Sequence, residues 1–249
     1  MSRAADTVRA DALAHQTGGR MAGEARRQQI LRVAMRLFSQ HGFRGTTTKE
    51  IAHEAGVSEA MVFRHFATKE ELYNAILDHK ACTGTFDPCN LLADAITRKD
   101  DRAVFAQLAR ALMQHHEQDT EFLRLLTHAA LEEHQLAELF WDRVVRQMYD
   151  FLGGYIRERQ RDGALRSVDP AIIIRAFLGM VIHHSLNNTL WDKQRRLLDI
   201  SNERAAREFT DILLSGVTSA AAAPARTNGK TKRSAVAART KKSTAKKNR

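Results

Sequence analysis

The chain has 249 residues, of which 43% are hydrophobic and 27% charged, a composition typical of a soluble globular protein. No apolar run approaches the roughly 20 residues that span a bilayer, and the first residues lack the apolar segment of a secretion signal. Two cysteines, Cys82 and Cys89, are too few for a disulfide framework or a zinc site, so we expect a reduced, cytoplasmic protein.

The net charge of +10 is unevenly distributed. Ten of the 39 Lys and Arg residues lie in 224–249, where there is no acid, and the other 29 balance the 29 Asp and Glu residues. Residues 24–80 carry nine basic and seven acidic side chains, whereas 81–223 carry 17 and 20. Basic charge is therefore placed where a nucleic acid would bind, in the first third of the chain and in the tail.

Residues 1–23 are polar and Ala-rich, with a Gly18-Gly19 break, and we predict a flexible arm in which Met21 is an alternative start to Met1. Apolar residues at helical spacing then predict an amphipathic helix from Glu24 to His41.

The next stretch has the pattern of two short helices joined by a tight turn. Thr47 and Glu50 have the spacing of a capping box, in which each side chain satisfies a free backbone donor at a helix start. Gly56 suits the left-handed conformation that ends a helix, and Ser58 suits the cap of a second helix over Glu59–Phe66. This plan is that of a DNA-binding helix-turn-helix.

A second capping box, Thr68 and Glu71, predicts a helix from Lys69 to about Ala81. The small helix-turn-helix core should lean on that helix and on the domain beyond it. Its predicted interior residues are Ile30, Phe38, Ile51, Val57, Val62 and Phe66.

Periodicity and caps predict further helices and no strand. They span Pro88–Arg98, Arg102–Gln118, Thr120–Ala130, Glu133–Asp162, Asp169 to about Asn188, and Ser201–Ser215, the last ended by Gly216. We therefore predict an all-α fold with a DNA-binding domain at 24–83, a helical effector-binding and dimerisation domain at 84–219, and a disordered Lys/Arg/Ala-rich tail at 220–249.

Residues 29–77 closely resemble the N-terminal domain of the TetR family of bacterial transcriptional regulators. The residues that carry the resemblance are Ala34, Leu37, Phe38, Gly42, Phe43, Thr46, Thr47, Ile51, Ala52, Ala55, Gly56, Val57, Ser58, Phe63, Arg64, His65, Phe66, Lys69, Glu70, Glu71 and Leu72. The resemblance implies a homodimeric, all-helical repressor that leaves double-stranded DNA when a small-molecule effector binds its C-terminal domain. Separately, enzymatic activity has no positive support in the sequence, and we expect no cofactor.

The resemblance also implies which residues bind DNA. Glu59, Ala60, Met61 and Arg64 match the positions that read base sequence, and Lys49 matches a position near a base or phosphate. The positions that grip the backbone, or lie beside it, are Thr47, Thr48, Ser58, Phe63, His65 and Lys69. Phe63 departs from the family, since many members have a Tyr there whose hydroxyl contacts phosphate.

For the C-terminal domain, the helix from Asp169 is apolar on every side in its first turns, which predicts burial all round. The resemblance implies that it pairs with the Ser201 helix and their mates in a four-helix dimer interface. The predicted interface residues are Ala176, Gly179, His183, Ala206, Phe209, Ile212 and Leu213.

A largely apolar effector is expected within the same domain. The large or adaptable residues on helices that enclose a cavity in this family are Phe105, Met113, Phe122, Leu126, Trp141, Met148, Tyr149, Phe177, Met180 and His184. Such residues more often form plain core than a pocket, so both interpretations stay open.

Other functions have less support in the sequence. The adjacent pairs His115-His116 and His183-His184 point to different helix faces and suit a metal poorly, and no catalytic triad stands out. The basic tail is either a solvated end or a nonspecific phosphate binder. A nucleoid-type protein that coats DNA mainly through this tail is therefore the alternative to a regulator.

Overall fold

The structure, a computed structural model, describes residues 23–83 and 87–219, so the predicted tail and almost all of the predicted arm lie outside the described residues. Within those ranges the fold is all-α, as predicted, with an isolated bridge between Leu165 and Thr218 in place of any strand. Residues 23–41 are helical. The helices that follow are α2 (Thr48–Glu54), α3 (Glu59–His65), α4 (Lys69–Thr83), α5 (Pro88–Thr97), α6 (Asp101–Gln118), α7 (Thr120–Leu131), α8 (Gln135–Phe140), α9 (Arg146–Arg161), α10 (Pro170–Leu186) and α11 (Asn202–Val217).

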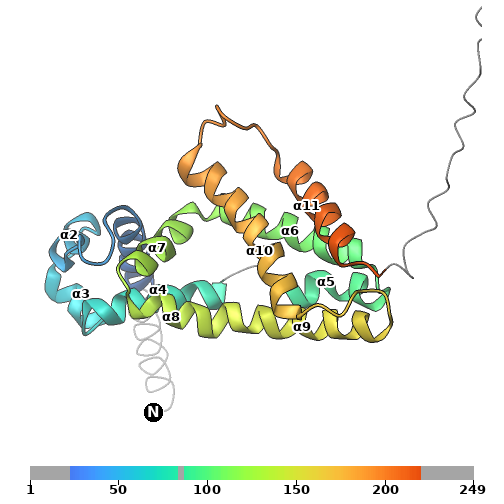
Figure 1. Cartoon of the computed structure of the whole chain (residues 1–249). Helices are drawn as coiled ribbons and strands as arrows, with labels where there is room; N and C mark the ends of the chain where they lie inside the picture. The colour runs from blue at the N-terminus through green and yellow to red at the C-terminus, as the bar shows by residue number, and fades with distance from the viewer. Residues whose placement is uncertain (1–22, 84–86, 220–249) are drawn as a thin grey trace, which may run out of the picture.

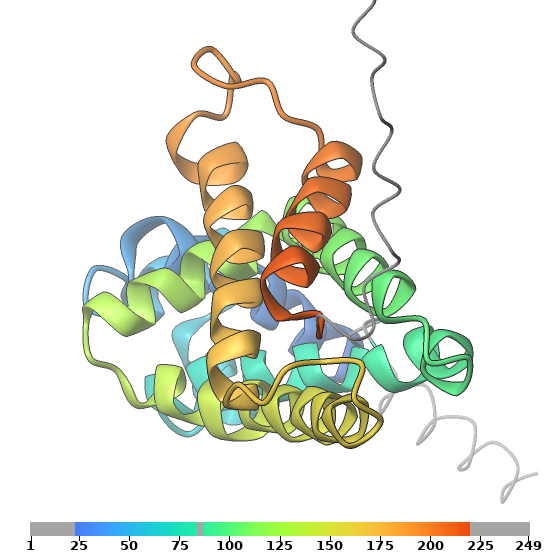
Figure 2. The same ribbon diagram turned by 45° about the vertical axis from the view of Figure 1, so that its right-hand side comes forward.

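The short helices α2 and α3 lie at one end of the molecule, and α5 lies toward the other (Figure 1). Helices α10 and α11 pack against each other and against α6, and the connection between them projects beyond the body of the protein (Figures 1 and 2). None of the described helices is long and apolar enough to cross a bilayer.

Two apolar cores hold the helices together. The first encloses five of the six predicted interior residues of the helix-turn-helix unit, with Val57 packed at its edge. It also takes in Leu72, Tyr73 and Ile76 of α4 and, from α7 and α8, Phe122, Leu125, Ala129 and Leu136. The second joins α5, α6, α9, α10 and α11. The expectation that the small N-terminal unit leans on later helices is thus confirmed.

The helix predicted over Glu133–Asp162 is present from Gln135 to Arg161, with a later start and a π-helical segment inside it. Glu133 has a left-handed backbone (φ 53°), and the His134 ring accepts a hydrogen bond from the Leu136 N–H (3.1 Å), so α8 begins only at Gln135. A π-helical segment, Trp141–Val145, then joins α8 to α9 without a break in the helical backbone. A second π-helical segment, Asn187–Trp191, extends α10 beyond its predicted end.

Gly216 does not end the last helix, contrary to the prediction. Helix α11 continues to Val217 because that side chain is buried in the second core and its carbonyl accepts a hydrogen bond from the Arg166 N–H (2.8 Å). Burial of one more apolar residue therefore outweighs the tendency of glycine to stop a helix.

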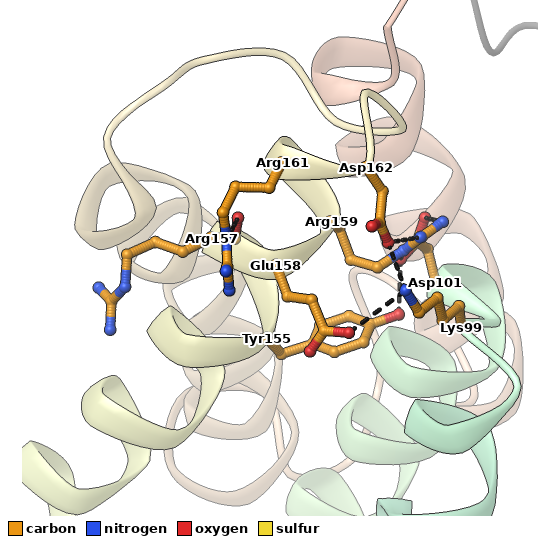
Figure 3. Close-up of polar contacts among 8 residues, drawn as sticks. All are labelled: Lys99, Asp101, Tyr155, Arg157, Glu158, Arg159, Arg161 and Asp162. Carbon is orange, nitrogen blue, oxygen red and sulfur yellow. Dashed lines mark hydrogen bonds and ion pairs between the residues drawn. The ribbon is translucent and has the colours of Figure 1, made fainter.

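A largely buried polar cluster fixes the end of α9 against the start of α6 (Figure 3). The Asp101 carboxylate accepts hydrogen bonds from the Tyr155 hydroxyl (2.6 Å) and from two nitrogens of Arg159 (2.8 and 3.2 Å). Arg159 also pairs with Asp162, which Lys99 contacts at 2.8 Å. Burial and the hydrogen bond to Asp101 raise the pKa of Tyr155, which keeps its hydroxyl a donor.

Candidate nucleic-acid interface

The helix-turn-helix is built by the caps that its sequence predicts. Thr47 and Glu50 form the reciprocal capping box at the start of α2, and Gly56 takes the left-handed conformation (φ 62°) in the turn. The Ser58 hydroxyl accepts a hydrogen bond from the Met61 N–H at the start of α3. The turn between α2 and α3 is therefore determined locally, which fixes the angle at which α3 leaves it.

Helix α3 has a buried and an open face. Val62 and the capping residue Phe66 lie in the first core. Glu59, Ala60, Phe63 and Arg64 are exposed, Phe63 to 45%, whereas Met61 is half-buried. The side chains predicted to read base sequence thus lie largely on the surface that a duplex could reach.

Residues of α2 complete this surface. Lys49 is exposed, and the Thr48 hydroxyl donates a hydrogen bond to the Glu59 carboxylate (2.5 Å), which joins α2 to α3. The Thr47 hydroxyl is occupied by its capping box, donating to Glu50 at 2.9 Å and accepting from the Glu50 N–H at 3.1 Å. A phosphate contact by that hydroxyl would therefore have to replace a helix cap.

His65 and Lys69 are less accessible than the other predicted DNA contacts. In the described part of the chain, Nε2 of His65 is buried without a hydrogen-bond partner, and burial lowers the pKa of this ring, which the neighbouring Arg64 and Arg27 lower further. The Lys69 ammonium lies 4.2 Å from the centre of the Phe43 ring, and burial lowers its pKa. Lys69 therefore lies as close to the contact between the N-terminal unit and the C-terminal helices as to the open surface.

That contact is centred on Glu132, the residue that caps the C-terminal end of α7. Its carboxylate accepts hydrogen bonds from the N–H groups of Phe43 (2.9 Å) and Arg44 (3.4 Å), and a Cβ added to Gly42 would lie 2.2 Å from it. We refer to Glu132 with Gly42, Phe43 and Arg44 as the Glu132 junction. It joins the C-terminal helices to the loop that leads into α2.

Two further contacts reinforce this arrangement. The Arg124 guanidinium donates to the Ser39 carbonyl (3.1 Å). The His134 ring packs against the rings of Phe43 and Tyr73, with centroids 4.3 and 4.7 Å apart. The sequence carries no signal for these contacts, because the partners lie far apart in the chain and are ordinary residue types.

The predicted dimer residues divide into two groups. Ala176, Gly179, His183 and Ile212 are exposed on α10 and α11, together with Ile172 and Ile182. Ala206 and Leu213 are buried in the subunit's own second core, and Phe209 is packed against it. Ala206 and Leu213 therefore have little surface left for a partner, so the exposed group is the part of the prediction that a dimer could use.

The ten predicted effector residues do not share one environment. The second core contains Phe105, Met113, Met148 and Phe177, and the partly buried Tyr149 and Met180 pack against it. The first core contains Phe122, and the partly buried Leu126 packs against it. Trp141 is exposed, and the ring of the buried His184 lies within hydrogen-bond distance of Asn202 (3.1 Å) and Asn188 (3.0 Å). An open surface hollow of about 690 Å³ lies elsewhere, beside Arg157, Arg161 and Ser167.

Comparison with known families gives two matches along the chain. Residues 30–76 match bacterial regulatory proteins of the tetR family, and residues 103–216 match the C-terminal domain of AefR-like transcriptional repressors. Together they cover the helix-turn-helix and most of the helices after α5.

Individual proteins are similar over different lengths. The transcriptional regulator AcrR of Shigella flexneri is 26% identical over 200 residues, 76% of this chain and 87% of that protein. The nucleoid occlusion factor SlmA of Haemophilus influenzae is 30% identical over 159 residues, 59% of this chain and 68% of that protein. The regulator YvkB of Bacillus subtilis is 52% identical, but only over 50 residues, 20% of this chain and 26% of that protein.

Solved structures share the fold at lower identity. AibR in complex with isovaleryl coenzyme A and operator DNA superimposes with a TM-score of 0.58 at 23% identity, over 76% of this chain and 98% of that one. The regulator PfmR of Thermus thermophilus gives 0.57 at 22% identity, over 75% and 97%.

Proposed function

Because this chain belongs to the TetR family of bacterial transcriptional regulators, we propose that it is a homodimeric repressor released from a palindromic operator by a small, largely apolar effector. The family makes it a DNA-binding regulator with a helix-turn-helix. The observation that supports operator binding by this chain is the open face of α3, on which Arg64 and Phe63 are exposed while Val62 is buried in the first core.

In this proposal α3 lies in the major groove. Arg64 makes a bidentate contact to guanine, and Ala60 or Met61 packs on a thymine methyl group. Lys49 and Thr48 bind the flanking backbone, which sets the register without reading sequence. Because the Lys69 ammonium lies over Phe43, we assign it to the Glu132 junction first and to phosphate second.

The dimer would form through the exposed stripe of α10 and the neighbouring face of α11. Ile172, Ala176, Gly179 and His183 recur at helical spacing, and the two small residues allow close approach of a second helix. Ile212 is the large apolar side chain exposed on α11. The two α3 helices would then be about 34–36 Å apart, one turn of DNA.

The effector would act by favouring a conformation in which α4 has shifted and that spacing is lost. A ligand shifts such an equilibrium only by its different affinity for the two states. AibR was solved with isovaleryl coenzyme A, so acyl-coenzyme A thioesters belong beside simple lipophilic compounds in a screening panel. A uniformly flat thermal-shift response across that panel would count against an apolar effector.

Operator binding tests the assignment of α3 directly. Fragments bound from genomic DNA supply a probe, and Arg64→Ala should weaken binding to it by about 1–3 kcal/mol per half-site while the dimer stays intact. Arg98→Ala, an exposed arginine at the end of α5, is the matched control. Undiminished operator binding by Arg64→Ala would show that another surface reads the DNA.

A nucleoid protein is the second candidate. It is favoured by the ten basic residues of 224–249 and by the similarity to a nucleoid occlusion factor. Footprinting separates the two functions, since a regulator protects a discrete palindrome, whereas a coating protein protects DNA in proportion to its length.

A further inference from the structure

The turn between α10 and α11 carries large apolar side chains in water. We define this α10–α11 turn as residues 191–200, which begin at the last residue of the π-helical segment Asn187–Trp191. Trp191 is 64% exposed, Leu197 84% and Leu198 67%. Apolar side chains gathered on one surface segment are unfavourable in water unless another surface covers them.

The α10–α11 turn is held in this shape by polar contacts. The Asp192 carboxylate accepts hydrogen bonds from the N–H groups of Arg196 (2.9 Å), Leu197 (2.9 Å) and Leu198 (3.4 Å), which lower its pKa. Arg195 adopts a left-handed backbone (φ 49°) and its guanidinium pairs with Glu117 of α6 at 2.8 Å. The two leucines could turn inward only if these contacts broke.

The turn is continuous with the exposed stripe of α10. The Trp191 ring meets the His183 ring edge-on, with centroids 5.6 Å apart, and His183 is the last member of the stripe that begins at Ile172. Beyond that point the turn projects past the ends of both helices (Figure 2). It thus lengthens the same apolar surface instead of forming a separate one.

We propose that the α10–α11 turn is an arm that packs on a second copy of this chain. The inference rests on the proposed dimer and adds a surface to it. A two-fold axis through the α10 stripes places the arm of each copy on the other copy, so Trp191, Leu197 and Leu198 of both copies are covered. The stripe itself includes Ala176 and Gly179, which offer little area toward the roughly 800 Å² per partner of a stable interface. Trp191 adds more, because an aromatic side chain buries about 150–250 Å² in full, and the 64% of Trp191 that is exposed corresponds to roughly 100–160 Å².

The test compares dissociation constants of the dimer, measured by analytical ultracentrifugation on the full chain. Leu197→Ser with Leu198→Ser should weaken the dimer by about tenfold or more, because the dimer no longer gains the burial of two leucine side chains from each copy. Leu131→Ser is the matched control, a 78% exposed leucine at the end of α7, and should leave the constant unchanged. Ile172→Arg with Ile212→Arg tests the helix faces alone.

The outcomes separate the arm from the dimer. If the arginine pair dissociates the dimer and the serine pair leaves it at wild-type strength, the arm is refuted and the helical interface stands. If neither pair changes the dimer, the proposed interface is itself wrong.

A second measurement leaves the arm unaltered. Trp141→Phe makes Trp191 the sole tryptophan, and its emission should shift to the blue as dilute monomer is concentrated into dimer. Emission that stays constant while sedimentation reports dimerisation would overturn the proposal.

Discussion

Replacing Glu132 by alanine tests whether one carboxylate holds the helix-turn-helix unit against the C-terminal helices. The carboxylate accepts from the backbone N–H groups of Phe43 and Arg44, which lie 89 and 88 residues earlier in the chain. Alanine would leave both donors without this partner, and the loop that leads into α2 would keep the long bond from the Arg44 guanidinium to the Glu132 carbonyl (3.5 Å) and the contact between the Phe43 and His134 rings.

The size of the effect follows from the two bonds. The 2.9 Å bond to Phe43 is half-buried and charge-assisted, a class that contributes about 1.5–3 kcal/mol. The 3.4 Å bond to Arg44 is long and exposed, so it adds little. We expect a loss of about 2 kcal/mol, which is a roughly 30-fold change in a local opening equilibrium.

Hydrogen exchange followed by mass spectrometry measures that opening. The peptide containing the Phe43 and Arg44 amides should exchange about 30-fold faster in Glu132→Ala, whereas peptides of α10 and α11 should not change. Glu138→Ala, an exposed glutamate on α8, is the control. Exchange at Phe43 equal to that of wild type would refute the role assigned to this carboxylate.

Three further predictions concern stability in urea titrations. Burial lowers the pKa of His116 from 6.5 to about 4, so between those pH values the proton binds mainly to the unfolded chain, and the free energy of unfolding decreases as the pH is lowered. His116→Gln should remove about 2–3 kcal/mol of this decrease by pH 4.5, and an identical decrease in the variant would contradict the assignment. Asp101→Ala should cost about 2–3 kcal/mol, because the largely buried Arg159 keeps only Asp162 as a partner and the Tyr155 hydroxyl loses its acceptor, whereas Glu203→Ala, which breaks an exposed pair with Arg110, should cost under about 1 kcal/mol; equal costs would show that burial is not the cause. Gly42→Ala should destabilise by at least about 1–2 kcal/mol, since it strains a left-handed backbone (φ 73°) beside the Glu132 carboxylate, and unchanged stability would refute that strain.

The helix-turn-helix could be predicted from sequence because its geometry is local. Thr47 with Glu50, Gly56 and Ser58 act on backbone groups within a few residues of themselves, and the structure confirms each of them. The second capping box was right in part: the Thr68 hydroxyl accepts from the Glu71 N–H, but the Glu71 carboxylate accepts from the Ala67 N–H, one residue earlier than predicted.

The contacts between distant elements could not be predicted in the same way. Glu132 looks like a surface glutamate at the end of a helix until folding brings Phe43 beside it. The π-helical segment at Trp141–Val145 has no proline or glycine to mark it, and it lies where the chain passes from α8, which packs on the first core, to α9, which packs on the second. Val217 prolongs α11 for the same kind of reason, a burial that only the assembled fold supplies.

The effect of the basic tail on DNA binding is expected to depend on its charge, so the salt dependence of binding tests it. Residues 224–249 hold ten basic side chains and no acid. Each one that docks on a phosphate of duplex DNA releases counterion and adds about −0.9 to the slope of log affinity against log salt.

Replacing the ten Lys and Arg residues of the tail by Ser and Gln keeps its length and removes its charge. If two side chains per subunit dock, the slope for a dimer should become shallower by about 3 to 4 between 50 and 200 mM salt, as measured by fluorescence anisotropy. The ratio of operator to nonspecific affinity should hold, because the tail has no means of reading base sequence, whereas Arg64→Ala should reduce that ratio. A slope equal to that of the natural tail would show that these charges stay in solvent, and would remove the main physical reason for considering a DNA-coating protein.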